Sequence, residues 1–262
     1  MMLKSDAPSA SLSSVTNAMR LLKVFTAESP EWGISELGRH LGVAKSTAHR
    51  LVTTLVAEGF LEQNPHNDRY RLGLLLFSMG TMVRRRMDVA EQSAMDLRAL
   101  ADQTHETVHL AVLHDDEILY LRNIESPHAI RPRSYLGVRM PAFCTSEGRA
   151  ILAHSAPTLV ARVLSSKLQA RTPKTITHKK MLMMKLAEVL QQGYAVDSEE
   201  SEHAMCGIAA PIFDANSQVV AAVGVVGPVH RLGKMQLRKL APVVTQTAAA
   251  ISTKLGHAAS DS

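Results

Sequence analysis

The sequence is short of the features that mark secreted, membrane-bound and disulfide-rich proteins. Its 262 residues include only two cysteines, Cys144 and Cys206, so we expect no disulfide framework and a reducing compartment, the cytoplasm. It contains no run of about 20 apolar residues, so we expect no membrane-spanning helix. Residues 1–13 are rich in Ser and Ala and lack the continuous apolar stretch of a signal peptide, which predicts a flexible tail.

The motifs of several enzyme classes are also missing. The sequence has no Gly-x-x-x-x-Gly-Lys phosphate loop, and the stretch 224–227 lacks the third glycine of a dinucleotide-binding fingerprint. Ser146 lacks the glycine two residues upstream that a nucleophile elbow requires. His203 and Cys206 form one His–Cys pair, whereas a zinc ion needs about four ligands. We therefore predict a protein without catalytic activity, bound metal or cofactor.

The positive charge of the chain is concentrated in its first third. Residues 1–86 contain 11 Lys and Arg against 7 Asp and Glu, and the remaining residues contain 18 against 17. A local excess of basic residues favours a polyanion partner such as nucleic acid. A basic surface without any partner has the same composition, so the charge alone leaves both interpretations open.

Apolar residues at helical spacing predict three helices in this first third. They cover about 15–25, 35–41 and 44–58. Gly42 lies between the second and third helices, where a tight turn needs a residue that is free to adopt a positive φ. We expect the third helix to direct four residues toward the core, namely Ala44, Ala48, Leu51 and Leu55.

The opposite face of the third helix carries no acidic residue before Glu58. Its side chains suit phosphate oxygens and base edges in a major groove, and they are Lys45, Ser46, Thr47, His49 and Arg50. Residues 60–72 predict a hairpin, or wing, with Arg69 near its tip and within reach of DNA. Each feature alone also fits a solvated surface. Together they predict a winged helix-turn-helix over 14–73 that binds double-stranded DNA.

A helical linker is predicted over 74–102, followed by an effector-binding domain over 103–257. Period-two alternation predicts strands near 106–112, 118–124, 129–136, 194–197, 207–213 and 219–226. Helical patterns cover about 143–155, 158–167, 177–192 and 234–255. Runs of strands with helices grouped around them indicate an α+β domain built on an antiparallel sheet. Such a domain commonly encloses one cavity for a small ligand.

Seven short blocks of the sequence resemble the IclR family of bacterial transcription regulators, and the resemblance extends from Val15 to about Leu255. Each block alone is a weak signal, whereas their combined order and spacing are specific. The blocks are Ile34–Leu37, Lys45–Arg50, Tyr70–Gly73, Pro141–Ala150, Gly193–Glu200, Ile208–Asp214 and Gly227–Pro228. The resemblance implies a GAF-like effector domain, dimers that often pair into tetramers, and no catalysis.

The resemblance also implies where an effector binds. The family's pocket is formed by a loop that enters a helix, by an acidic position and by two strand segments. The corresponding residues of this chain are Thr145, Ser146, Glu147, Asp197, Met205, Cys206, Gly207, Gly224 and Val226.

Three of these positions differ from family members that bind small oxoacids, which often have Cys at the position of Gly207 and Ser at those of Gly224 and Val226. Loss of the thiol and of both hydroxyls is expected to make the cavity larger and less polar. We therefore predict an effector that is larger or more apolar than a two- or three-carbon oxoacid. Backbone N–H groups at the helix start near Glu147 still offer a place for a carboxylate.

The sequence thus supports one main hypothesis and one alternative. In the first, the chain is a sequence-specific regulator, a repressor rather than an activator. It binds a near-palindromic operator as a homodimer or tetramer, and a small metabolite modulates this binding. In the alternative, a GAF-like binding or enzymatic module carries a winged helix that contacts other proteins. Salt-dependent DNA binding separates the two hypotheses.

Overall fold

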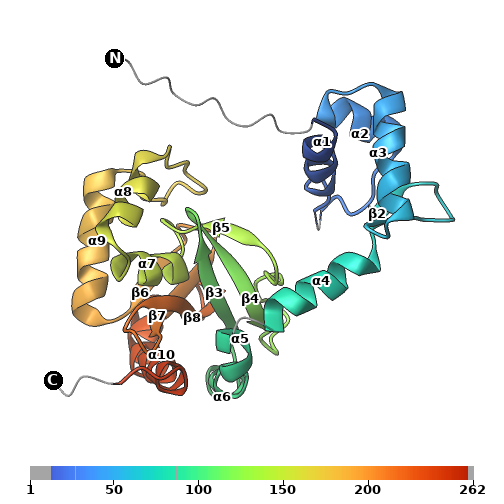
Figure 1. Cartoon of the computed structure of the whole chain (residues 1–262). Helices are drawn as coiled ribbons and strands as arrows, with labels where there is room; N and C mark the ends of the chain where they lie inside the picture. The colour runs from blue at the N-terminus through green and yellow to red at the C-terminus, as the bar shows by residue number, and fades with distance from the viewer. Residues whose placement is uncertain (1–12, 27, 86–87, 259–262) are drawn as a thin grey trace, which may run out of the picture. The chain divides into compact units, whose positions relative to one another are not determined.

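A computed structural model of the chain describes residues 13–26, 28–85 and 88–258, and it consists of two compact units, residues 1–86 and 87–262 (Figure 1). All but the last residue of the tail predicted over 1–13 lies outside the described residues. Within the described ranges, no helix is both long and apolar enough to cross a membrane.

The N-terminal unit begins with three helices around a small apolar core. They are α1 (Ser13–Leu22), α2 (Ile34–Leu41) and α3 (Lys45–Ala57). Leu21 of α1, Leu37 of α2 and Val52 of α3 are buried in this core. Gly42 ends α2 with a φ of 70°, the left-handed conformation expected of this turn, which lets α3 follow after two residues.

The buried face of α3 differs in part from the sequence prediction. Ala48, Val52 and Leu55 are buried, at the spacing of one helical face, while Leu51 lies beside them partly buried. Ala44 is exposed, because it precedes the helix with an extended backbone (ψ 147°) and stands outside the helical face. The prediction for Ala44 was therefore wrong.

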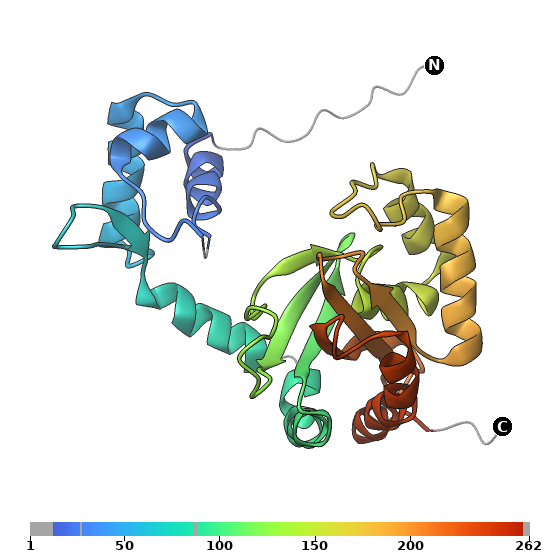
Figure 2. The same ribbon diagram turned by 180° about the vertical axis from the view of Figure 1, so that it is seen from behind.

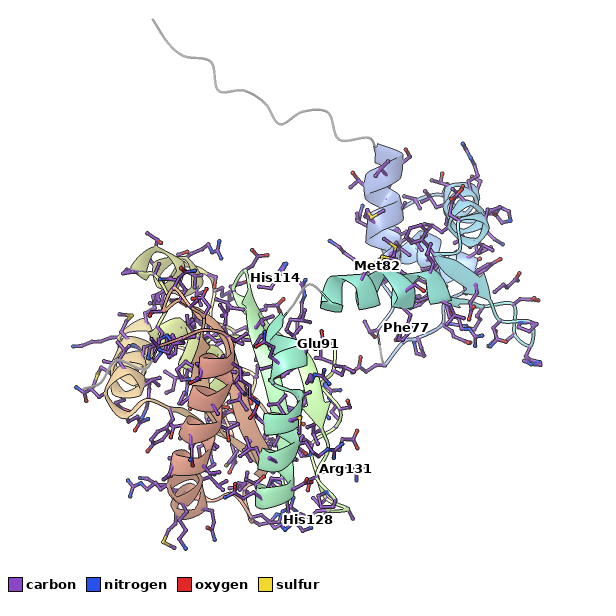
Figure 3. The ribbon with its side chains drawn as sticks, turned by 60° about the horizontal axis from the view of Figure 1, so that its bottom comes forward. Phe77, Met82, Glu91, His114, His128 and Arg131 are labelled. Atoms are coloured by element: carbon purple, nitrogen blue, oxygen red, sulfur yellow. The ribbon has the colours of Figure 1, made fainter. Side chains whose placement is uncertain are left out.

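A two-stranded wing follows α3, as expected. Strands β1 (Leu61–Gln63) and β2 (Tyr70–Leu72) pair antiparallel. Trp32 extends the pairing through two backbone hydrogen bonds with Tyr70, which ties the wing to the segment before α2. The unit ends with α4 (Leu74–Arg85), on which Phe77 and Met82 are exposed (Figure 3).

The C-terminal unit is built on a six-stranded antiparallel sheet in the order β5-β4-β3-β8-β7-β6. Neighbouring strands pair antiparallel throughout, as the alternating sequence predicts. The strands are β3 (Thr107–His114), β4 (Glu117–Ile124), β5 (Arg139–Pro141), β6 (Ala195–Ser198), β7 (Met205–Phe213) and β8 (Val219–Pro228).

Helices cover both faces of this sheet (Figures 1 and 2). One face packs against α5 (Asp88–Gln92), α6 (Ala94–Thr104) and α10 (Lys234–Lys254), and α6 and α10 lie side by side (Figure 3). The other face packs against α7 (Ser146–Ala153), and α8 (Pro157–Ser165) and α9 (Lys179–Gln192) pack against α7 in turn. Each face has its own apolar core, and we call the second the α7 face.

The connector predicted over 74–102 is divided between the two units. Only α4 lies in the N-terminal unit, whereas Leu97, Leu100 and Ala101 of α6 are buried in the core beneath α10. Helix α6 is therefore part of the C-terminal unit, which begins at residue 87, before the predicted domain start at 103.

The strand predicted over 129–136 was wrong. No residue between β4 and β5 forms regular secondary structure, and the short strand β5 at 139–141 pairs with β4 instead. Pro127 and Pro132 lie in this segment, and proline has no N–H to donate to a strand ladder. We call residues 125–138 the β4–β5 loop.

The start of α7 packs closely against the chain segment that precedes it. The side chain of Thr145 caps the helix by accepting a hydrogen bond from the Gly148 N–H (3.2 Å). A Cβ atom placed on Gly148 would lie 2.2 Å from the carbonyl oxygen of Ala142. Only glycine therefore allows this approach.

We predict that Gly148→Ala destabilises the fold by about 1–3 kcal/mol or more, because backbone atoms must move to admit the methyl group. Urea unfolding of the full chain measures the change. Gly80→Ala is the matched control, since nothing lies within 4 Å of a Cβ built on that helical residue. Equal stability of the Gly148 variant and the parent chain would contradict the packing described.

Candidate DNA interface and effector site

The outer face of α3 is exposed and free of carboxylates. Ala48 points inward between the flanking exposed residues, which separates a core face from a solvent face. The helix contains no Asp or Glu. The exposed residues include all those predicted for the DNA contact on this helix, namely Lys45, Ser46, Thr47, His49 and Arg50. This face offers cationic and hydroxyl groups without acidic groups that would repel phosphate.

Arg69 was predicted as the DNA contact of the wing, but its guanidinium has partners within the protein. It pairs with the Glu36 carboxylate of α2 (2.6 Å) and donates to the Glu31 carbonyl oxygen (3.1 Å). Glu36 in turn accepts a hydrogen bond from the Gly33 N–H at the start of α2 (3.0 Å). In this geometry Arg69 holds the wing against the helix-turn-helix.

The α7 face of the sheet brings together most of the residues predicted for the effector site. Strand pairing places Asp197, Gly207 and Val226 in one row across β6, β7 and β8. The neighbouring row joins Gly224 of β8 to His109 of β3. Because side chains alternate along a strand, Met205 lies on the same face as Gly207. The start of α7, from Thr145 to Glu147, is buried beside these strands.

Gly207 and Gly224 do not enlarge the cavity, contrary to the sequence prediction. A Cβ atom on Gly207 would lie 2.8 Å from Ser146 Oγ. A Cβ atom on Gly224 would lie 2.5 Å from Glu147 Oε1. The volume that larger side chains would take at these strand positions is therefore filled by two polar side chains of α7. Glycine at positions 207 and 224 therefore does not make the pocket larger or less polar.

Cys206 lies on the opposite face of the sheet and is not brought to the site. Its side chain is buried in the core beneath α6 and α10, because strand alternation directs it away from Gly207. Burial raises the pKa of both thiols, that of Cys144 to about 12, so both stay protonated. These cysteines act as small core residues.

The structure adds three ring residues that the sequence analysis missed. His109 lies on β3 with its ring 4.7 Å from the Tyr120 ring and 5.5 Å from the Tyr135 ring. Its Nδ1 is 3.3 Å from Glu147 Oε1. Tyr135 on the β4–β5 loop donates a hydrogen bond to the Glu202 carboxylate. The alternation of Val108, Leu110 and Val112 already places His109 on the opposite face of its strand. A polar residue within an apolar strand was therefore the signal in the sequence that pointed to His109.

Asp197 is the buried carboxylate at the other end of the site. It accepts hydrogen bonds from the Glu200 N–H (2.7 Å), the Ser201 N–H (3.3 Å) and the Ser201 hydroxyl. Burial outweighs these bonds and the nearby Arg149 charge, and it raises the pKa of Asp197 to about 7. The protonated form is therefore favoured in the folded protein relative to the unfolded chain.

This raised pKa predicts how stability depends on pH. The favourable contribution of protonated Asp197 is complete below its unfolded pKa of 3.8 and is lost as the pH rises toward about 7. We expect the unfolding free energy of the parent chain to fall, relative to that of Asp197→Asn, between about pH 4 and pH 7. Urea titrations of both proteins across this range measure it, and a constant difference would contradict the assigned pKa.

Comparisons with known proteins agree with this two-part organisation. The family model for the IclR helix-turn-helix domain matches residues 14–65. The model for the bacterial transcriptional regulator IclR C-terminal region matches residues 81–253. The first match covers the helices that carry the α3 face, and the second begins within α4, includes the α7 face and alone covers more than half of the chain.

Full-length relatives are similar over nearly the whole chain. The HTH-type transcriptional regulator XynR of Escherichia coli is 31% identical over 249 residues, covering 95% of this chain and 99% of its own. The DNA-binding transcriptional repressor YiaJ of the same organism is 30% identical, covering 87% and 82%. An IclR homologue of Microbacterium hydrocarbonoxydans, solved in complex with 4-hydroxybenzoate, is 27% identical with a TM-score of 0.81, covering 93% and 99%. These relatives are regulators and not enzymes, and the chain belongs to the IclR family of bacterial transcriptional regulators.

Proposed function

We propose that this regulator binds a specific operator through the outer face of α3 and represses transcription in the cytoplasm. The exposed, carboxylate-free surface from Lys45 to Thr53 is the observation that carries the proposal. Phosphate contacts supply affinity and base-edge contacts supply specificity, and this surface offers side chains for both. Repression is favoured over activation by similarity to a relative named as a repressor.

The side chains of α3 divide between two kinds of contact. We assign Arg50 and Lys45 to phosphate and guanine, since Arg binds guanine O6 and N7 in a bidentate manner. Ser46, Thr47 and His49 are assigned to base edges. We assign Arg69 a positioning role beside the predicted wing contact, because its pairing with Glu36 holds the wing in place while its side chain stays partly exposed.

The DNA-binding form is a homodimer or a tetramer. Helix α4 carries an exposed apolar surface that includes Leu74, Phe77 and Met82, more than an isolated subunit leaves in contact with water without a function. Two identical subunits place two recognition helices in successive major grooves. The operator is therefore a near-palindrome of two spaced half-sites.

An effector bound on the α7 face modulates operator binding. A related regulator holds 4-hydroxybenzoate, and the buried polar groups Glu147, Asp197 and His109 gather on this face here. The effector is not a two- or three-carbon oxoacid, because Ser146 and Glu147 occupy the space above Gly207 and Gly224. It changes DNA affinity only by binding one arrangement of the protein more tightly than another.

We predict that Arg50→Ala weakens binding to an operator selected from random DNA by about 1–3 kcal/mol, the value of a bidentate base contact. Fluorescence anisotropy measures the affinity. Arg98→Ala is the matched control, since Arg98 is an exposed arginine on α6 of the other unit. An unchanged affinity of the Arg50 variant rules out the assigned contact.

Affinity for duplex DNA is also predicted to depend steeply on salt. Each phosphate neutralised lowers the logarithm of the affinity by about 0.9 per logarithmic unit of salt concentration. Lys45→Ala is expected to reduce this slope by about one unit across unrelated sequences. A flat salt response of the parent chain would favour the alternative, a winged helix that contacts proteins.

A further inference from the structure

A carboxylate of the protein itself occupies the centre of the predicted effector site. Glu147 is buried, and its Oε1 lies 2.5 Å from the place where a Cβ on Gly224 would stand. Any residue other than glycine at 224 would displace this carboxylate. The strand and the helix therefore fit each other around a charged group, at a place where a sheet and a helix usually meet through apolar side chains.

Two polar groups hold this carboxylate as they would hold a bound anion. His109 Nδ1 lies 3.3 Å from Oε1, and the Ser146 hydroxyl donates to Oε2 (3.0 Å). Burial acts to raise the pKa of Glu147, yet the hydrogen bond and charge of His109, together with Ser146, outweigh it and lower the pKa. Glu147 is therefore ionised at neutral pH.

The buried arginine near the site already has its charge paired within the protein. Arg149 Nε donates to the Phe143 carbonyl oxygen (2.8 Å), and Nη1 donates to the Val196 carbonyl oxygen (3.3 Å). Both Nη atoms also bind the carboxylate of Glu200. A ligand carboxylate placed beside Glu147 would therefore meet a like charge without a compensating arginine, and burying it there would be unfavourable.

One polar atom of the site remains without a partner. His109 Nε2 is fully buried and has no hydrogen-bond partner among the described residues. The His109 ring contacts the rings of Tyr120 and Tyr135, which also contact each other (5.3 Å between centroids), so a ligand that reaches Nε2 would lie beside aromatic side chains. A buried nitrogen of this kind requires a hydrogen-bond partner, and a ligand in this site would supply one.

We propose that Glu147 is a built-in anion that fills the anion subsite of the effector pocket and selects against carboxylate effectors. The inference rests on the proposal that an effector binds at the α7 face. The effector of this chain is then an uncharged molecule with hydroxyl groups and a flat apolar part. Its hydroxyls bind the Glu147 carboxylate and His109 Nε2, and its apolar part lies against the tyrosine rings.

Chemical rescue tests this assignment in the full chain without DNA. Glu147→Ala removes the carboxylate and leaves His109, Ser146 and an empty space above Gly224. We expect 100 mM acetate, compared with chloride at equal ionic strength, to raise the melting temperature of this variant by about 3–5 °C. That shift corresponds to a dissociation constant on the order of 10 mM. The parent chain is expected to show no such shift.

Three controls separate this effect from general stabilisation by salt. Glu188→Ala removes an exposed carboxylate of α9 and is expected to respond to acetate as the parent chain does. Glu147→Gln fills the space without charge and is expected not to respond. Acetamide has the shape of acetate without its charge, and we expect it not to stabilise Glu147→Ala.

The experiment tests the proposal even if Glu147→Ala is unfolded in chloride. A Glu147→Ala protein that is unfolded in chloride and folds in acetate supports it, and one that stays unfolded in acetate overturns it. Equal acetate shifts in the variant and the parent chain also overturn it, as does stabilisation of the parent chain by pyruvate or glyoxylate. None of these results depends on DNA, so failure here is distinct from failure of the proposed regulatory function.

Discussion

The close approach of α7 to the sheet is the constraint on which the C-terminal domain depends. Gly207 and Gly224 have no side chains, and this lets Ser146 and Glu147 enter the space above β7 and β8. Gly148 allows the same helix start to pack against the segment at Ala142. Glycine at these three positions thus allows the polar start of α7 to lie in a buried layer, where each polar group requires a hydrogen-bond partner.

Partners are supplied from elements far apart in the sequence. Arg149 of α7 is paired with Glu200 beyond β6, and Glu147 is paired with His109 of β3. Buried charges are costly without such pairing, because removal from water disfavours the charged form. These two pairs connect α7 to β3 and to the segment after β6, on either side of the central strands β8 and β7. A ligand that displaced α7 at the proposed site would therefore also act on β3 and on the segment after β6.

The N-terminal unit also contains ion pairs that hold its elements together. The outer face of α3, the candidate DNA surface, is exposed and free of acidic groups, and the ion pairs described for this unit lie away from it. The pair between Arg69 and Glu36 fixes the wing, and the Glu36 carboxylate also holds the backbone at Gly33. Acidic residues of this unit have partners on α2, on the segment before it and on the wing, where Glu62 pairs with Arg71. The cations of α3 are left facing outward.

The sequence by itself determined the elements that depend on local pattern: the acid-free face of α3, the glycine turn before it, the wing and the alternating strands. It failed at 129–136, where Pro132 has no N–H to donate to a strand ladder, and at Ala44, which precedes its helix. Strand alternation already separates Cys206 from Gly207, but only the tertiary structure decided which of the two faces α7 covers, and this removed Cys206 from the site and added His109. The spacing of apolar residues predicts the helix or strand to which a residue belongs. It does not predict that the space above Gly224 is filled by Glu147, which lies on a helix 77 residues earlier in the sequence.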